Sequence, residues 1–110
     1  MTTRLEARVE AGHRIRLAGE LDISTVPELE QSLDGLADDP YDPLVLELTD
    51  LTFIDSTGLR AILRLARSHA DRGRLVLRAP TPRVLEVLTI CGVLGGPSNL
   101  ELEREEEGAV

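Results

Sequence analysis

The segment Phe53–Gly58 most constrains the fold of this chain, because it joins two patterns that belong to different secondary structures. The run Leu44–Leu48 before it is apolar at four positions of five, which is typical of an interior strand covered on both faces. From Leu59 to about Arg72, apolar side chains recur at helical spacing. A strand is therefore expected to run into a short loop that opens directly into a helix.

That loop presents two hydroxyl groups, those of Ser56 and Thr57, at the expected N-terminus of the helix. Backbone N–H groups at such a position lack intrahelical partners, and the helix dipole favours negative charge. A phosphate on the Ser56 hydroxyl would therefore be tolerated by the fold. The plain alternative is that Asp55 to Gly58 only start a helix, since Asp, Ser and Thr are preferred capping residues.

Two strands are expected before this loop. Residues 4–10 alternate apolar and charged side chains, with Leu5, Ala7 and Val9 on one side. A tight turn at 11–13 leads to a second strand, antiparallel to the first, that ends at Gly19-Glu20-Leu21-Asp22. The pattern predicts an opening hairpin.

Helices are predicted in three segments. The first spans 25–37 and starts with Thr25 and Glu28 at capping-box spacing. The second is stopped by Gly73, and its predicted buried face comprises Leu59, Ile62, Leu63, Ala66 and Ala70. The third begins at Thr81 and is stopped by Gly92, with a predicted buried face made of Val84, Leu85, Leu88 and Cys91.

With short strands at 75–77 and 99–103, the order of elements predicts an α/β fold. We expect one mixed, mostly parallel sheet with helices packed against it. The 110 residues suffice for one domain, predicted over residues 1–104, followed by an acidic disordered tail at 105–110. Loops at the carboxyl ends of parallel strands usually hold the site in such folds, and the Asp55 loop is one of these.

Composition argues against several classes of function. A net charge of −8 disfavours binding to nucleic acid or to an anionic membrane surface. The aromatic residues are Tyr41 and Phe53 alone, which leaves little surface for stacking bases. No signal peptide and no membrane-spanning run is apparent, and the single cysteine cannot form an internal disulfide. We therefore expect a cytoplasmic protein.

Catalytic and metal-binding motifs are also missing from the sequence. His13 falls in a turn and His69 on a helix, where we expect both to be exposed, and neither has metal-ligand spacing. There is no G-x-S-x-G elbow and no nucleotide-binding glycine motif. The sequence therefore predicts no metal, no cofactor and no enzymatic activity.

A phosphorylated Ser56 would still have a function without catalysis. A phosphate adds about −1.5 to −2 charges at pH 7. One charge pair about 6 Å apart in a partly wetted interface is worth roughly 1–3 kcal/mol at an effective dielectric of about 20–40. This corresponds to about a tenfold to hundredfold change in affinity for a docked partner.

The D-S-T-G loop after an aliphatic strand, together with Gly19-Glu20-Leu21-Asp22, resembles the STAS domain of bacterial anti-sigma factor antagonists. The resemblance covers residues 4–95, and the predicted elements come in the family's order. Gly73 before the strand at 75–77 and the helix end at 89–92 match as well. One departure is that the family continues into a fourth helix, whereas here 95–97 are followed by the short acidic tail.

The resemblance implies a switch in partner choice. In the family, the unphosphorylated protein binds an anti-sigma factor that is also a serine kinase, and sigma factor is released. The kinase then phosphorylates the loop serine, which maps onto Ser56, and a serine phosphatase reverses this. Asp22 maps onto an acidic residue that helps to contact the kinase, and Asp55, Thr57 and Gly58 complete the loop. Such switches control stress responses or sporulation.

If the predicted order is right, Glu20, Asp22 and Asp55 lie at one edge of the sheet as an acidic patch around Ser56. Alternatively, Asp22 only caps the following turn and Glu20 is a solvated strand end. A stripe of arginines on the second helix either contacts a partner or is a solvated face; it comprises Arg60, Arg64 and Arg67.

Other functions remain open from the sequence. A STAS domain can serve as an adaptor subunit of a larger complex, such as a lipid-transport ATPase, in which the serine loop is an interface. A sensor of nucleotides or small ligands is a further possibility, although no phosphate-binding motif supports it. No exposed apolar stripe is apparent, so we expect a monomer when the protein is free.

Overall fold

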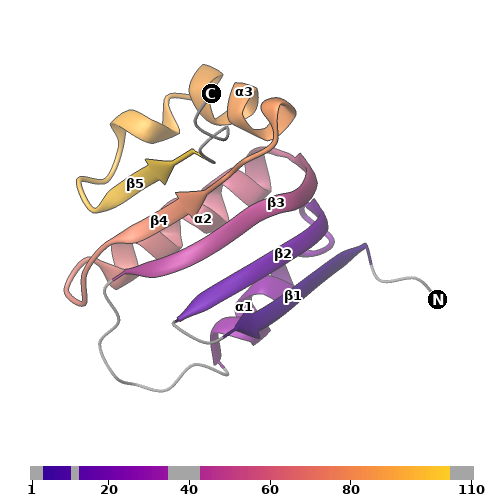
Figure 1. Ribbon diagram of the computed structural model, residues 1–110, viewed down its shortest axis with the longest axis horizontal. Coiled ribbons are helices and arrows are strands. Elements are labelled where there is room, and N and C mark those ends of the chain that lie inside the picture. The colour runs from indigo at the N-terminus through magenta and orange to yellow at the C-terminus, as the bar shows by residue number, and fades with distance from the viewer. Residues whose placement is uncertain (1–3, 11–12, 35–42, 105–110) are drawn as a thin grey trace, which may run out of the picture.

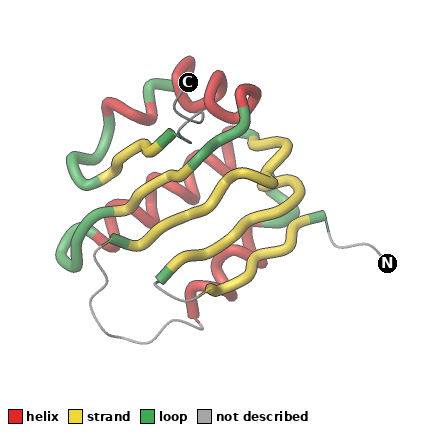
Figure 2. The backbone as a smooth tube through the Cα atoms, in the orientation of Figure 1, coloured by secondary structure: helices red, strands yellow, loops and turns green. Residues whose placement is uncertain are grey.

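The elements of the fold follow the predicted order in the computed structural model, which describes residues 4–10, 13–34 and 43–104. Figure 2 shows strands and helices alternating after the first two strands. The elements are β1 (Leu5–Glu10), β2 (Arg14–Leu21), α1 (Val26–Asp34), β3 (Leu44–Ile54), α2 (Ser56–His69), β4 (Leu75–Arg78), α3 (Pro82–Ile90), the 3₁₀ helix η1 (Val93–Gly95) and β5 (Leu100–Glu103).

The strands form one five-stranded sheet in the order β1-β2-β3-β4-β5 (Figure 1). β1 and β2 make the antiparallel hairpin, and all the other neighbours pair in parallel. Leu21 pairs with Ile54, so β2 and β3 end side by side. The predicted α/β fold with a mixed, mostly parallel sheet is confirmed.

The core lies between the sheet and the helices, with α1 and α2 behind the sheet in the view of Figure 1. Alternate strand residues point into it, as their spacing requires. The largest fully buried side chains are all aliphatic: Leu5, Ile15, Leu17, Leu21, Leu29, Leu44, Leu46, Leu48, Leu51, Ile62, Leu75 and Leu77. Val9 departs from the predicted inward face of β1, since it is 45% exposed near the end of this edge strand.

β3 is longer than its apolar run predicted. It continues past Leu48 to Ile54, although Thr49, Asp50, Thr52 and Phe53 are exposed. Pairing with β2 extends it, with register shifts on either side of Gly19 that accommodate the extra residues. The following helix begins at Ser56, where its N-terminus was predicted, and only Asp55 separates strand from helix.

The first helix is described over Val26–Asp34, so the predicted turn that includes Leu36 and Ala37 lies outside the described residues. The predicted capping box of Thr25 and Glu28 was wrong, because it does not form. The Thr25 hydroxyl accepts from the Asp22 N–H at 2.9 Å and donates to the Glu20 carbonyl at 2.8 Å. It therefore closes the turn that leaves β2, and the Glu28 N–H donates instead to the Thr25 carbonyl at 2.9 Å.

Three predictions about the ends of the later helices were wrong. His69 is buried. Asn99, the residue before β5, donates to the Ala66 and Gly73 carbonyls and so ties the end of α2 to the start of β5. The helix ends at His69, so Ala70 is exposed and Gly73 lies in the turn beyond the cap. Cys91 is exposed rather than a core residue.

The third helix otherwise follows its prediction. Val84 and Leu88 are buried, and Leu85 is half-buried. Gly92 adopts a left-handed conformation with φ of 68° directly after the C-cap residue, as expected for a glycine that ends a helix.

The second face of the sheet carries charged side chains. One row in register crosses all five strands and comprises Arg8, Arg16, Glu47, Arg78 and Glu103. Arginine stems can cover a sheet while their guanidinium groups stay hydrated. The second face of β3, which was expected to be covered like an interior strand, is thus covered in part by long charged side chains.

Glu47 lies at the centre of this charged row, with only 2% of its side chain exposed. Arg78 Nη1 donates to both of its carboxylate oxygens, at 2.7 and 3.0 Å. The Thr49 hydroxyl donates to it at 2.5 Å, and Arg14 lies 3.6 Å away. The buried carboxylate is therefore compensated by ion pairing and hydrogen bonds, as buried charges require.

Replacing Glu47 should expose how much the sheet depends on this carboxylate. Glu47→Gln removes the charge that Arg78 and Arg14 face, and should lower the free energy of unfolding by about 1–3 kcal/mol. Urea denaturation measures this. The matched control is Glu101→Gln, which breaks the half-exposed pair with Arg74 and should change stability by less than about 0.5 kcal/mol. Equal effects of the two changes would contradict the central role of Glu47.

Candidate functional site

Asp55 joins three segments at the carboxyl end of the sheet. Its backbone N–H donates to the Leu21 carbonyl at 3.2 Å, which links the ends of β2 and β3. As the N-cap of α2, its Oδ1 accepts from the Gly58 N–H at 2.8 Å. Its Oδ2 accepts from the Ile23 N–H at 3.4 Å, in the turn between β2 and α1. One carboxylate therefore holds the start of α2 against the neighbouring turn.

Ser56 is the first residue of α2, and its side chain is exposed. Thr57 follows in the first turn and is half-buried. The Ser56 hydroxyl makes no hydrogen bond within the described part of the chain. The prediction that both hydroxyl residues lie at the N-terminus of a helix is confirmed, and Ser56 is the more exposed of the two.

Gly58 is buried where α2 crosses the end of β2. A Cβ atom at this position would lie 2.6 Å from the Leu21 carbonyl oxygen and 2.9 Å from Cγ1 of Ile54. The backbone that approaches Gly58 closely is therefore that of the chain's own β2. Glycine lets the first turn of the helix rest directly on the sheet.

Asp22 is almost buried, with 8% of its side chain exposed. Its Oδ1 accepts from the Ser24 N–H at 2.9 Å and the Ser24 hydroxyl at 2.7 Å, while its Oδ2 accepts from Arg4 at 2.6 Å. These interactions lower the pKa of Asp22 below its ordinary value of 3.8, with the Ser24 side chain as the main cause, against the opposing effect of burial. Asp22 thus caps its turn, the alternative that the sequence left open.

Arg4 is the residue of this site that sequence reasoning missed. Its guanidinium pairs with both Glu20 and Asp22, and its Nη1 donates to the Ser24 hydroxyl at 3.3 Å. The predicted acidic patch of Glu20, Asp22 and Asp55 is therefore partly neutralised, because Glu20 and Asp22 share the Arg4 cation. The signal was present in the hairpin, because pairing of Leu5 with Gly19 brings Arg4 beside Glu20.

Two exposed apolar side chains near Asp55 were also not anticipated. Ile23 is 73% exposed in the turn that Asp55 holds, and Phe53 is 36% exposed near the end of β3. Ile23 stands between Asp22 and Ser24, which is a signal that would have indicated its exposure, whereas Phe53 is followed by buried Ile54 and carries no such signal. Both lie within three residues of Asp22 or Ser56 along the chain, at the same end of the sheet.

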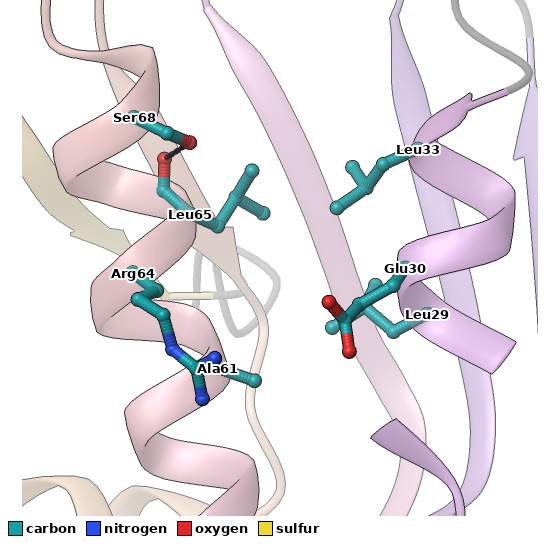
Figure 3. Close-up of a pocket in the computed structure, with 7 residues that line it drawn as sticks. All are labelled: Leu29, Glu30, Leu33, Ala61, Arg64, Leu65 and Ser68. Carbon is teal, nitrogen blue, oxygen red and sulfur yellow. Dashed lines mark hydrogen bonds between the residues drawn. The ribbon is translucent and has the colours of Figure 1, made fainter. Parts of the chain in front are cut away.

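A separate groove of about 250 Å³ lies between α1 and α2 (Figure 3). Its lining is mostly apolar and comprises Leu29, Glu30, Leu33, Ala61, Arg64, Leu65 and Ser68. Across the ranges that the structure covers, no cluster of three or more potential metal ligands occurs. In the same ranges, no helix has the length and apolar character needed to cross a membrane.

Comparison with known proteins assigns the fold to a family. The family model described as "Mlab, STAS domain" matches residues 5–101. BtrV of Bordetella bronchiseptica, named as an anti-sigma factor antagonist, is 35% identical over 79 residues, which cover 71% of this chain and 68% of that protein. The chain therefore belongs to the STAS domain family, within which its sequence relatives are anti-sigma factor antagonists.

A second relative matches over a shorter stretch. The anti-sigma-B factor antagonist of Staphylococcus aureus strain NCTC 8325 is 38% identical over 47 residues, which are 43% of this chain. The match spans 44% of that protein's length, less than half.

Solved structures share the fold. The anti-sigma factor antagonist of Mycobacterium paratuberculosis superposes with a TM-score of 0.74 at 20% identity, covering 94% of this chain and 86% of that one. The Bacillus protein SpoIIAA, at 22% identity, superposes with TM-scores of 0.66 in its unphosphorylated form and 0.58 in its phosphorylated form. The alignments cover 94% of this chain and 90% or 94% of SpoIIAA. At these identities the superpositions establish the fold alone.

A methyl group at Gly58 tests the packing of α2 on the sheet. Helix propensity alone favours alanine over glycine by about 1 kcal/mol. The 2.6 Å approach to the Leu21 carbonyl should outweigh this, so Gly58→Ala should be destabilised by about 1–3 kcal/mol in urea denaturation. Gly95→Ala is the control, because no atom lies within 4 Å of its added Cβ. A Gly58→Ala variant as stable as the parent would refute the close approach.

The lowered pKa of Asp22 gives a defined acid sensitivity. Its ionised form stabilises the fold fully above the unfolded pKa, near 3.8, and this contribution is lost as the pH falls through the lower folded value. Asp22→Asn should therefore be less stable than the parent at pH 7, and the difference should shrink as the pH falls below about 4. Thermal unfolding at several pH values, with exposed Asp50→Asn as control, measures this. A difference independent of pH would contradict it.

Proposed function

We propose that this protein is an anti-sigma factor antagonist switched off by phosphorylation of Ser56. In its unphosphorylated form it binds an anti-sigma factor that has serine kinase activity, and sigma factor is released. The observation that carries the proposal is the exposed Ser56 hydroxyl at the first position of α2. Support comes from the family and from SpoIIAA, whose fold has been solved in both phosphorylation states.

Phosphorylation at this position should act on the partner rather than on the fold. The Ser56 side chain makes no hydrogen bond in the described ranges, so a phosphate breaks no existing contact. The start of a helix also tolerates negative charge. A partner docked over the loop meets added bulk and about two negative charges, which suffices for a tenfold to hundredfold loss of affinity.

The proposed partner-binding residues form two groups: those engaged within the fold and those exposed to a partner. Asp22, Asp55 and Gly58 are engaged in the fold, so we assign them to positioning the loop. Glu20 and Thr57 are partly exposed and are assigned to direct contact. We further propose a cytoplasmic setting, a serine phosphatase that reverses the switch, and a role in a stress response or sporulation. The protein itself acts without catalysis.

Ser56→Ala should be the decisive variant. Purified with the anti-sigma factor that it captures from its own cells and with ATP, the parent should gain one phosphate by intact-mass analysis, and Ser56→Ala none. Ser68→Ala, which removes an exposed serine near the other end of α2, is the control and should still be phosphorylated. A Ser56→Ala protein phosphorylated like the parent would overturn the site. Capture of an ATPase and a permease instead of an anti-sigma factor would replace the proposal with the adaptor function.

A charge mimic measures the strength of the switch. Ser56→Glu should bind the anti-sigma factor at least several-fold more weakly than the parent, because its carboxylate lies at the proposed interface. The effect should fall short of a phosphate's, which carries more charge. Isothermal titration calorimetry with Ser56→Gln as the uncharged control gives the comparison. Equal affinities for the Glu and Gln variants would rule out charge as the cause.

A further inference from the structure

Arg60 lies four residues after Ser56 in α2, and its side chain is exposed. Residues four apart on a helix are neighbours on one face, with Cβ atoms about 5–6 Å apart. Within the ranges that the structure describes, the Arg60 guanidinium makes no hydrogen bond and no ion pair. A cation without a partner is therefore placed one turn from the proposed phosphoacceptor.

The direction of side chains on a helix favours contact between these two residues. Side chains lean toward the helix N-terminus, so Arg60 extends over the turn that contains Ser56. Figure 3 shows this tilt on the same helix, where the Arg64 side chain runs back toward Ala61. The same geometry carries the guanidinium of Arg60 toward the Ser56 side chain.

Other charged groups at this end of the sheet are already engaged. Asp55 accepts from two backbone N–H groups, and Arg4 is shared by Glu20 and Asp22. Arg64 and Arg67 are exposed on the same helix but lie eight and eleven residues from Ser56, beyond the reach of a side chain. Arg60 is therefore the cation best placed for a phosphoryl group on Ser56.

We propose that Arg60 binds the phosphoryl group of phosphorylated Ser56 within α2. This rests on Ser56 being the phosphoacceptor. A guanidinium can donate two parallel hydrogen bonds to phosphate oxygens, which gives a stronger and more directional pair than an amine would. Phosphorylation then changes the surface twice: it adds a phosphate, and it draws Arg60 away from any acidic group of a docked partner. Arg60 is thus a positioning residue of the phosphorylated state.

The pKa of the phosphate reports this pair directly. The full chain is prepared with phosphoserine encoded at position 56, and its second ionisation, near pH 6, is followed by ³¹P NMR. A neighbouring cation favours the dianion, so Arg60→Gln should raise the phosphate pKa by about 0.3 unit or more. The phosphate pKa of the Arg60→Lys variant should lie between that of the parent and that of Arg60→Gln. Arg67→Gln is the matched control and should titrate like the parent.

The carboxylates of Asp55, Asp22 and Glu20 and the guanidinium of Arg4 also face this end of α2, but they are the same in every variant compared. A phosphate pKa unchanged by Arg60→Gln would overturn the role of Arg60. Because phosphoserine is encoded, this outcome does not depend on a kinase. Absence of phosphate on Ser56 in the cell would overturn the proposed function instead, so the two failures are distinguishable.

Discussion

The hydrogen bonds of the Asp55 carboxylate are the interactions on which the rest of the site depends. One oxygen caps α2 through Gly58 and the other holds Ile23, while the Asp55 backbone bonds to the end of β2. A strand end, a helix start and a neighbouring turn are therefore fixed by a single residue. This arrangement works only because Gly58 lets the first turn of α2 touch the Leu21 carbonyl. The exposed Ser56 hydroxyl is consequently presented from a rigid base.

Internal ion pairing explains why the net charge of −8 says little about the site. Arg4 neutralises part of the acidic cluster beside Asp55, and Glu47 is compensated by arginines on the second face of the sheet. Electrostatic complementarity with a partner therefore depends on the few groups left without an internal partner, such as Arg60, and not on the sum of charges.

Local patterns predicted the order of elements, the hairpin, the parallel sheet and the helix start at Ser56, because each rests on side-chain period or capping chemistry near in sequence. The misjudged features depend on distant segments. Asn99 bonds to the end of α2 across 33 positions of sequence, and pairing with β2 extends β3 through polar residues. The Thr25 hydroxyl closes a turn instead of capping α1. No pattern confined to those segments contains this information.

Because the site is held in one arrangement, phosphorylation of Ser56 is not expected to change the fold. Fold-switching needs an element with two arrangements of similar energy. Asp55 and Asp22 are each held by several hydrogen bonds in one arrangement, and Gly58 lies where only a glycine fits against β2. The difference between the two chemical states must then be local, in charge and in the side chains that can reach the phosphate. An exposed arginine can move at little cost, whereas a capped helix start cannot. Under the proposed function, the partner would therefore distinguish two surfaces on one unchanged fold.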